Sequence, residues 1–427
     1  MTSGTNLKSL SDWLEHCERG HPLAIDMTLD RAREVKERLG IRFDVPVVAV
    51  AGTNGKGSTC AILESIGHHA GWRVGLYSKP HILRFEERCR INGKMVDEAD
   101  LVPHFEAVER ARGDISLTYF EHTTLAILRL LSQTPLDLVI LEVGLGGRRD
   151  AVNVVDADCA VVTGIDIDHT EYLGPDRESI GFEKAGIFRQ GKPAVIGDMH
   201  PPESLLSYAH QLGTPLRVSG RDFEMIEDTP YRWTWKGWRT TWRDLPLPRL
   251  VGAGQLQNSS TALAAIDLLP LPRPSYRAIF AGLREVNLAG RFQTISISPR
   301  VIIDVAHNRQ SVSMLASTLR NQRCRGRTFG VFGCMKDKDI TEMIAEMSPI
   351  VAHWFFADLP MDRAARASDL VESISNSDAL VATAFKTVAE ALTAAKQQSS
   401  HLDRIVVFGS FITVSEALKS AAATSRG

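Results

Sequence analysis

The stretch Gly52 to Ser58, GTNGKGS, carries residue types suited to binding a phosphate. Its three glycines leave backbone N–H groups open to a ligand, and Lys56 adds a full positive charge. The apolar run Val45 to Val50 before it predicts a buried parallel strand, and the apolar spacing after it predicts a helix over residues 58–67. In a strand followed by a glycine turn and a helix, the backbone N–H groups of the turn and the N-terminus of the helix point toward the same place. This arrangement favours phosphate binding over an ordinary tight turn.

The loop departs from the common pattern G-x-x-x-x-G-K-[ST] in two places. Val50 stands where that pattern has its first glycine, and Gly57 separates Lys56 from the hydroxyl of Ser58. The hydroxyl that normally follows the lysine is therefore displaced by one residue. Because the strand context, the glycines and the lysine remain, the prediction is still a nucleotide-binding loop.

Two candidate metal ligands follow buried strands. Leu136 to Val143, LDLVILEV, is the strongest buried-strand signal in the chain and carries Glu142 near its end. A second apolar run, residues 157–165, is followed by His169. Because open α/β sheets bind ligands at the carboxyl ends of their strands, we expect both side chains to face the phosphate loop. A lone histidine is more often structural, but one placed after a strand, opposite a glutamate and a phosphate loop, favours a ligand role.

Bulk properties limit the class of protein. The 427 residues predict two or three domains, and a net charge of −2 gives no overall attraction to nucleic acid or membrane. The six cysteines are scattered without a C-x-x-C pair, so neither a zinc site nor a disulfide framework is indicated. The N-terminus lacks an apolar signal core, and no apolar run is long enough to span a bilayer. We therefore expect a soluble, cytoplasmic protein.

Basic and aromatic residues are interleaved in residues 231–242, YRWTWKGWRTTW. Such a segment can form a stacking platform for single-stranded nucleic acid. The alternation of Trp233 and Trp235 around Lys236-Gly237 instead predicts a β-hairpin with one buried face. We favour the hairpin because the overall charge is close to neutral.

A second α/β pattern begins after the proline-rich break at Pro270 to Pro274. Its predicted strands alternate with helices, and apart from the first connection this pattern indicates a doubly wound sheet. The predicted strands cover residues 293–297, 301–305, 328–332, 354–357, 379–383 and 405–408.

Several separate motifs along the whole chain resemble the Mur ligase superfamily in its folate-ligase form. They are AGTNGKGS, SLTYFE, LEVGLGG, DHTEYLG, EKAGIFR, GRF and DVAHN. The resemblance implies an α/β fold with a P-loop-containing, Mur-ligase-type central domain and a smaller, Rossmann-like C-terminal domain. On this basis residues 1–288 would bind ATP and the pterin, residues 289–427 would form the second domain, and ATP would lie between them. Members of the family are usually monomers.

The function that the resemblance implies is ATP-dependent amide-bond formation. L-glutamate would be joined to dihydropteroate, and to the γ-carboxylate of reduced folates, through an acyl phosphate, with one or two Mg²⁺ ions. No enzyme nucleophile is needed for this chemistry, which agrees with the lack of a Ser-His-Asp arrangement. Two alternatives are a cell-wall Mur-type ligase and a nucleotide-gated binding protein without ligase activity. The motif SLTYFE argues against the first, and the predicted metal ligands argue against the second.

The resemblance also implies site residues for the nucleotide and the metal. Those for ATP are Thr53, Asn54, Gly55, Lys56, Gly57, Ser58, Asn258, Arg291 and Asp304. Catalytic roles fall to Lys56, Lys184, His169 and His307, and metal ligands would be Glu142, His169, Ser58 and Lys184. Lys184 in EKAGI resembles the superfamily position where lysine becomes N6-carboxylysine; a solvated helix lysine is the alternative.

The pterin would contact three segments, according to the same resemblance. These are Asp26, Met27 and Thr28; then Thr118, Tyr119, Phe120 and Glu121, with the aromatic ring stacking on the pterin; and Arg149, Asp150 and Ala151. For the first segment, an Asp or Thr cap on the following helix explains the residues equally well. For the second, a helix cap and core packing are the alternative.

Lys79 departs from the resemblance. The folate ligases usually have serine at this position, and its hydroxyl helps to hold magnesium. An ammonium cannot ligate a metal, so Lys79 either turns away or partly replaces the magnesium against the phosphates. We favour the second course.

Overall fold

The computed structural model describes residues 7–23, 26, 28–374 and 381–424. The chain divides into two compact units, which we describe separately. Unit 1 comprises residues 1–81, 85–249 and 256–286, and unit 2 comprises residues 82–84, 250–255 and 287–427. Within the described residues, none of the helices has both the length and the apolar character needed to cross a membrane.

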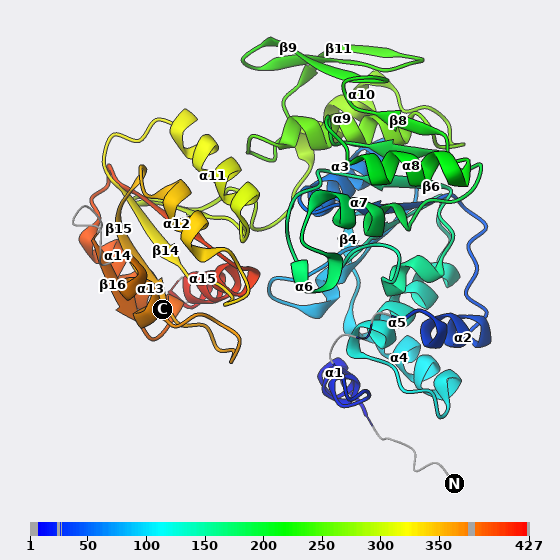
Figure 1. The fold of residues 1–427 in the computed structure, drawn as a ribbon, viewed down its shortest axis with the longest axis horizontal. Helices are drawn as coiled ribbons and strands as arrows, with labels where there is room; N and C mark the ends of the chain where they lie inside the picture. Colours follow the sequence, from blue (N-terminus) through cyan, green and yellow to red (C-terminus); the bar gives the residue numbers. More distant parts are fainter. Residues whose placement is uncertain (1–6, 24–25, 27, 375–380, 425–427) are drawn as a thin grey trace. The chain divides into compact units, whose positions relative to one another are not determined.

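Unit 1 is built on an eight-stranded sheet of order β4-β3-β2-β5-β1-β6-β7-β8 (Figure 1). Its strands β2, β5, β1, β6, β7 and β8 run parallel, and β3 and β4 pair antiparallel at one edge. The strands are β1 (Val47–Ala51), β2 (Val74–Tyr77), β3 (Cys89–Ile91), β4 (Lys94–Met95), β5 (Leu138–Glu142), β6 (Cys159–Val162), β7 (Ala194–Ile196) and β8 (Leu216–Val218).

The helices of unit 1 follow these strands in an α/β alternation. They are α1 (Leu10–Glu18), α2 (Asp30–Arg38), α3 (Lys56–His69), α4 (Glu98–Arg112), α5 (Tyr119–Gln133), α6 (Thr170–Leu173), α7 (Arg177–Ala185), α8 (Glu203–Leu212), α9 (Gln255–Ile266) and α10 (Tyr276–Glu285). Two 3₁₀ turns, η1 (Phe85–Arg88) and η2 (Ala151–Val154), complete it.

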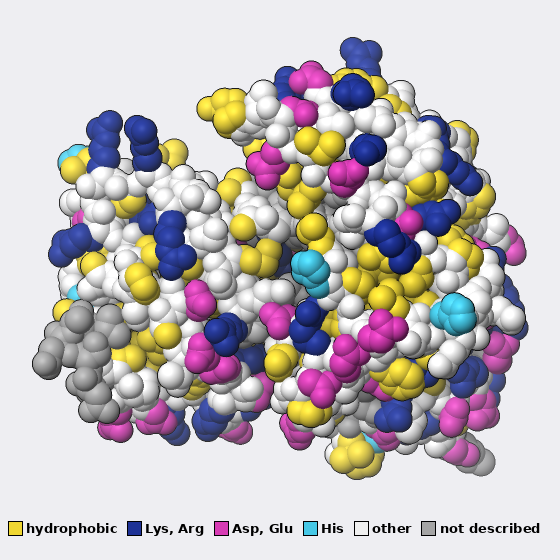
Figure 2. Space-filling view, turned by 45° about the horizontal axis from the view of Figure 1, so that its top comes forward, with side chains coloured by type: hydrophobic (Ala, Val, Ile, Leu, Met, Phe, Trp, Pro, Cys, Tyr) yellow, Lys and Arg dark blue, Asp and Glu magenta, His cyan; other side chains and the backbone are white. Residues whose placement is uncertain are grey.

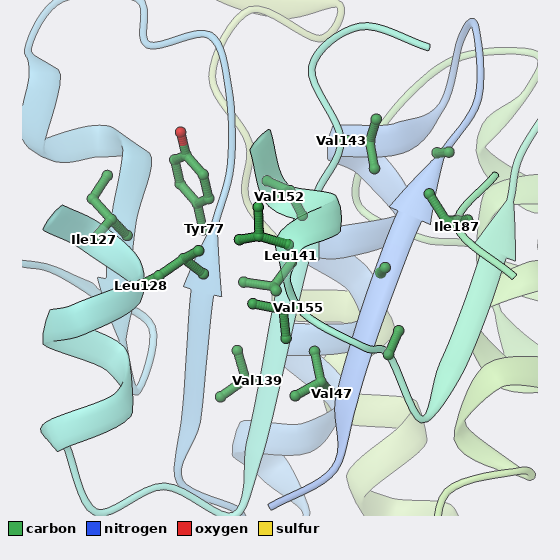
Figure 3. Close-up of a cluster of buried hydrophobic side chains, with 14 of the residues drawn as sticks. Val47, Tyr77, Ile127, Leu128, Val139, Leu141, Val143, Val152, Val155 and Ile187 are labelled. Carbon is green, nitrogen blue, oxygen red and sulfur yellow. The ribbon is translucent and has the colours of Figure 1, made fainter. Parts of the chain in front are cut away.

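The central strands are continuous apolar runs because they are covered on both faces. Every residue of β1 and of β5 is buried, including Glu142 at the end of β5. Figure 3 shows side chains from three neighbouring strands gathered with those of α5 in one cluster: Val47, Tyr77, Val139, Leu141, Ile127 and Leu128. The buried phenol of Tyr77 is hydrogen-bonded to Thr124 of α5 at 2.9 Å. This packing fixes the strand ends that carry the candidate site.

The predicted hairpin is confirmed, and it belongs to a three-stranded antiparallel sheet. Its strands are β9 (Glu224–Thr229), β10 (Arg232–Lys236) and β11 (Thr241–Pro246), in the order β11-β10-β9. Trp233 and Trp235 are fully buried, and their indole N–H groups donate to Pro246 O and Ser260 O. These two rings have no exposed face for stacking, which favours the hairpin over the stacking platform. The sequence did not predict β9, whose residues are mostly polar and exposed.

Unit 2 holds a six-stranded sheet of order β12-β13-β17-β14-β15-β16. Only the β12–β13 pair is antiparallel, so the predicted doubly wound sheet is confirmed, including its exceptional first connection. The strands are β12 (Gln293–Ile297), β13 (Arg300–Ile303), β14 (Thr328–Phe332), β15 (Val351–Ala357), β16 (Ala382–Phe385) and β17 (Arg404–Phe408). The helices are α11 (Arg309–Asn321), α12 (Ile340–Met347), α13 (Ala367–Ile374), α14 (Val388–Gln398) and α15 (Phe411–Thr424).

Charged side chains of both signs are interspersed over the face of the protein drawn in Figure 2. This distribution agrees with the net charge of −2. On that face, a broad single-sign surface of the kind that attracts nucleic acid is not seen.

Candidate active site

The phosphate loop lies between β1 and α3, as the sequence predicts. Helix α3 begins at Lys56, and its N-cap is Gly55, which has a φ of 92° and provides no side-chain cap. The Lys56 ammonium donates to the carbonyl oxygens of Gly52 at 2.8 Å and Thr53 at 3.0 Å. The loop thus holds its cation at the N-terminus of a 14-residue helix, where backbone amides and the helix dipole favour an anion.

The loop is fixed to the segment that follows β6. The Thr53 hydroxyl donates to Asp166 O at 2.9 Å and accepts from Asp166 N–H at 3.1 Å. The Thr163 hydroxyl donates to Asn54 O at 2.7 Å. Thr53 therefore uses its side chain to shape the loop, and the loop's position depends on residues more than a hundred positions away.

Two positions of the phosphate loop require glycine because other side chains lie very close to the backbone there. Gly52 has a φ of 147°, and a Cβ there would collide with the Thr163 hydroxyl oxygen. Gly55 has a φ of 92°, and a Cβ there would collide with the side-chain oxygen of Asn258. The second collision places Asn258, on α9, directly against the phosphate loop. The structure therefore brings together two of the residues that the sequence assigned to the nucleotide.

Gly52→Ala is expected to lower the free energy of unfolding by about 2–5 kcal/mol, because it adds both backbone strain and a steric clash. Gly164→Ala is the matched control in the adjoining loop, since a Cβ there meets open space. Thermal unfolding and ADP titration calorimetry measure both effects. Equal melting temperatures for the two variants would contradict the assigned fit of the loop.

Glu142 and His169 follow strands on either side of β1. β5 and β6 both pair with β1, and Val50 is in register with Glu142. The Glu142 side chain is buried, and its Oε2 accepts the backbone N–H of Lys79 at 3.1 Å. His169 is the N-cap of α6 with a φ of 53°, and its Nε2 lies 3.9 Å from Asp168 Oδ2. Glu142 therefore lies beside the end of β1, whereas a His169 side chain that faces the phosphate loop stays a prediction.

Lys184 is buried near the end of α7. The pKa of its ammonium is lowered to about 7, mainly by burial and also by the nearby Lys56 ammonium, while Asp168 opposes the shift. Lys56 and Asp168 are thus each within electrostatic range of Lys184. A solvated helix lysine is excluded by this burial. Sequence reasoning missed Asp168, although its position directly before His169 was a usable signal.

Two motifs meet backbone to backbone beside Lys184. The Arg148 N–H donates to Glu183 O at 2.9 Å, and a Cβ on Gly147 would lie 2.9 Å from the carbonyl oxygens of Glu183 and Lys184. The motifs LEVGLGG and EKAGIFR are therefore one packed unit, which explains why both need glycine.

Arg31 joins two of the three predicted pterin segments. Its guanidinium pairs with Asp26 at 2.7 Å and with Glu121 at 3.2 Å. The hydrogen bond from Arg31 is the main cause that lowers the pKa of Asp26. The N-cap of α2 is Leu29 without a side-chain hydrogen bond, so the helix-cap alternative for Asp26 and Thr28 is wrong. Sequence reasoning missed Arg31, which is one of several arginines on a predicted helix.

The segment from Thr118 to Glu121 forms a capping box. The Thr118 hydroxyl accepts from Glu121 N–H at 3.1 Å, and Glu121 Oε2 accepts from Thr118 N–H at 2.8 Å. The cap alternative is thus confirmed for these two residues, which does not exclude pterin contact by Tyr119 and Phe120. Thr28 and Arg149 are exposed, Ala151 is buried in η2, and Met27 lies outside the described residues.

Asp150 organises the loop after β5. Its Oδ2 accepts the N–H groups of Gly144 and Leu145, both at 2.9 Å, and its Oδ1 accepts Val152 N–H at 3.0 Å. The Lys79 ammonium lies 3.5 Å from the same Oδ1. The Lys79 side chain is therefore buried and its ammonium contacts Asp150, while contact with the phosphates of ATP stays a prediction.

The three predicted residues of unit 2 lie close together. Asp304 accepts the N–H groups of Phe292 and Ala306, both at 2.8 Å, while burial raises its pKa against the influence of Arg291. The rings of His307 and Phe411 are 5.8 Å apart, and the Arg291 guanidinium lies 5.5 Å from the Phe411 ring. Phe411 is a neighbour that sequence reasoning did not identify.

A metal at this site would need ligands from the described residues. In that part of the chain, no group of three or more His, Cys, Asp or Glu side chains is arranged to hold a metal ion. The donor types still fit magnesium: Glu142 supplies a buried carboxylate, and Ser58 supplies a buried hydroxyl in the phosphate loop. Such a site would be completed by nucleotide phosphates and water, which is common for magnesium.

Comparison with known proteins gives matches over nearly the whole chain. Residues 50–212 match the Mur ligase middle domain, and residues 290–411 match the Mur ligase, glutamate ligase domain. Dihydrofolate synthase/folylpolyglutamate synthase of Escherichia coli K12 is 44% identical over 411 residues, which cover 96% of this chain and 95% of that protein.

Two solved structures show the same fold. The structure of E. coli FolC in complex with DHPP and ADP superposes with a TM-score of 0.93 at 43% identity, covering 98% of this chain and 99% of that one. A bifunctional folylpolyglutamate synthase/dihydrofolate synthase with Mn, AMPPNP and L-glutamate bound gives a TM-score of 0.90 at 42% identity, covering 97% and 98%. The predicted fold class is thereby confirmed.

Proposed function

This chain belongs to the dihydrofolate synthase/folylpolyglutamate synthase family of Mur-type ligases, and we propose that it joins L-glutamate to 7,8-dihydropteroate and to reduced folates with cleavage of ATP. It is an ATP-dependent ligase of folate metabolism. The observation that carries the proposal is the phosphate loop, which has Lys56 at the start of α3 and Asn258 against Gly55, beside the buried carboxylate at the end of β5.

The reaction needs two anions to be brought together. A carboxylate oxygen of the acceptor attacks the γ-phosphorus of ATP, and the bond to the β–γ bridging oxygen breaks, giving ADP and an acyl phosphate. The glutamate amine then attacks the carbonyl carbon, loses a proton, and expels inorganic phosphate. The protein must therefore position the substrates and stabilise negative charge on the transferring group.

The phosphate loop supplies the protein's part at ATP. Lys56 is released from the carbonyl oxygens of Gly52 and Thr53 when it can pair with the γ-phosphate instead. The first amides of α3 bind the phosphate oxygens. Asn258 contacts the same loop and would bind the nucleotide from α9. Arg291 and Asp304 of unit 2 are proposed as further nucleotide ligands, and His307 as a group near the reacting end.

Glu142, His169 and Ser58 are the proposed protein ligands of magnesium. The bound ion would neutralise charge that develops on the phosphates. The backbone N–H of Lys79 donates a hydrogen bond to Glu142 Oε2, and this bond fixes the orientation of the carboxylate.

Lys184 is proposed to carry a carboxylate as N6-carboxylysine. Carbamate formation requires a neutral amine. The pKa of Lys184 is lowered to about 7, mainly by burial, so a large fraction of the protein molecules carry a neutral Lys184 amine at neutral pH. The modified group is an anion, which converts the repulsion between Lys184 and Lys56 into attraction. It would orient magnesium beside the phosphate loop.

The acceptor site is proposed to use the three segments around Arg31 and Asp150. Asp26, Thr28, Tyr119, Phe120, Arg149 and Ala151 come from these segments. The Arg31 bridge between Asp26 and Glu121 holds two of them together without substrate.

We further propose that the protein acts as a monomer in the cytoplasm. The described cysteines are all free thiols, and five of the six are buried, which suits a reducing compartment.

A substrate panel tests the function. Phosphate release from ATP and glutamate should depend on dihydropteroate or a reduced folate, and a cell-wall precursor should not replace them. Tight ATP binding without phosphate release under any of these conditions would favour the nucleotide-gated binding protein instead.

A further inference from the structure

Lys79 stands on the short segment after β2 and has no role in the proposed chemistry so far. Its side chain is only 7% exposed, although it carries a cation. A buried ammonium costs free energy unless nearby groups stabilise it. The groups around the ammonium therefore indicate its role.

Three groups surround the ammonium. The Nζ lies 3.6 Å from the centroid of the Phe120 ring, 4.9 Å from that of Tyr77, and 3.5 Å from Asp150 Oδ1. A cation over an aromatic face is attracted by the ring quadrupole, and more strongly where water is excluded. The ammonium thus links the first turn of α5 to the loop that Asp150 organises.

The backbone of Lys79 makes a separate contact. Its N–H donates to Glu142 Oε2 at 3.1 Å. The main chain therefore serves the proposed metal ligand, and the side chain contacts two residues proposed for the acceptor, Phe120 and Asp150, while its charge also acts on Glu142. A side-chain substitution separates the two contacts because it leaves the N–H in place.

We propose that Lys79 is a positioning residue for the acceptor site, whose ammonium sets the Phe120 ring and the Asp150 loop in place to bind the aromatic pterin. This inference rests on the proposed function. It places the side chain at the acceptor and not at the phosphates of ATP. A serine or alanine there would leave the gap between Phe120 and Asp150 without a cation.

The test compares Lys79→Met, Lys79→Arg and the exposed control Lys94→Met by steady-state kinetics. Lys79→Met keeps an unbranched side chain of nearly the same length and removes the charge, so the KM for dihydropteroate should rise at least about ten-fold. The KM for ATP and kcat should stay within about three-fold. Lys79→Arg should keep the acceptor KM within about three-fold of the wild type, because it retains a cation.

Three results would overturn the inference. They are an unchanged acceptor KM in Lys79→Met, a rise in the KM for ATP as large as that for the acceptor, and a rise of more than ten-fold in the acceptor KM of a folded Lys79→Arg. Thermal unfolding shows whether each variant folds. If Lys79→Met does not fold, Lys79→Arg alone decides.

A double variant shows whether Lys79 acts through the ring. If it does, the acceptor KM of the double variant Lys79→Met/Phe120→Leu, relative to the wild type, should be smaller than the product of the rises in the two single variants. Multiplicative effects would assign Lys79 a role independent of Phe120 and contradict the inference.

Failure of the proposed function is distinguishable from failure of this inference. The first appears as a wild-type enzyme that forms no glutamyl product from dihydropteroate. Calorimetric titration of dihydropteroate into the wild type and Lys79→Met measures the acceptor site directly, without turnover. A dissociation constant that is equal for both proteins contradicts the positioning role.

Discussion

Lys56→Ala is expected to lower kcat about a thousand-fold while the dissociation constant for ADP rises less than ten-fold. The ammonium is the loop's side-chain cation, and a single charge stabiliser at a transferring phosphoryl group is worth roughly 10²–10⁵ in rate. ADP binding depends more on the backbone amides at the start of α3, which the substitution leaves in place. Single-turnover kinetics and ADP calorimetry measure the two effects separately.

The control for Lys56→Ala is Lys94→Ala, which removes an exposed lysine from β4 in the same unit. It should behave as the wild type in both measurements. A Lys56→Ala enzyme with a near-normal ligase rate would show that the phosphate-loop assignment is wrong.

Lys184→Ala is expected to lower kcat at least about a hundred-fold, since it removes the proposed carbamate anion beside Lys56. The wild-type enzyme should also lose activity as the pH falls below about 7. The sign follows from the pKa of Lys184, which burial lowers to about 7: below that value the amine is protonated and cannot take up carbon dioxide. Bicarbonate should restore activity to enzyme depleted of carbon dioxide.

Carbon-13 NMR of enzyme equilibrated with labelled bicarbonate measures the modification itself. A carbamate signal in the wild type that is missing in Lys184→Ala is the expected result. Lys192→Ala is the matched control, because Lys192 is half-exposed and pairs with Asp158. An unlabelled wild type together with a fully active Lys184→Ala would refute the carbamate.

Local sequence order was enough to locate the phosphate loop and the strand ends. The run before Gly52 and the run Leu138–Leu141 before Glu142 are apolar, as is typical of buried parallel strands, and both became central strands of one sheet. Since parallel strands end at a common edge, the placement of Glu142 and of the segment with His169 followed from the same reasoning.

Long-range partners were not predictable in this way. In the sequence, nothing distinguishes Arg31 from the other arginines. In the fold it pairs with both Asp26 and Glu121, which are 95 positions apart in the sequence. Phe411 and Asp168 likewise show their neighbours only in the fold. The strand β9 was missed because its exposed polar residues give no alternation of apolar side chains.

Lys79 shows how one substitution changes a prediction that rests on resemblance. Charge and valence alone suggested that its ammonium would replace a metal at the phosphates. In the structure, the side chain is long enough to reach Asp150 and the face of Phe120, which together stabilise it. Side-chain reach, which a motif does not specify, gives the ammonium these partners.

The central claim is that the acceptor carboxylate attacks ATP directly at this site. The most direct measurement uses dihydropteroate labelled with oxygen-18 in its carboxylate, incubated with enzyme, ATP and L-glutamate. Attack on the γ-phosphorus transfers one labelled oxygen into inorganic phosphate when the acyl phosphate is displaced, so mass spectrometry should find singly labelled phosphate in step with product. Product formed with unlabelled phosphate would contradict the acyl-phosphate ligase, as would phosphate release without any glutamyl product.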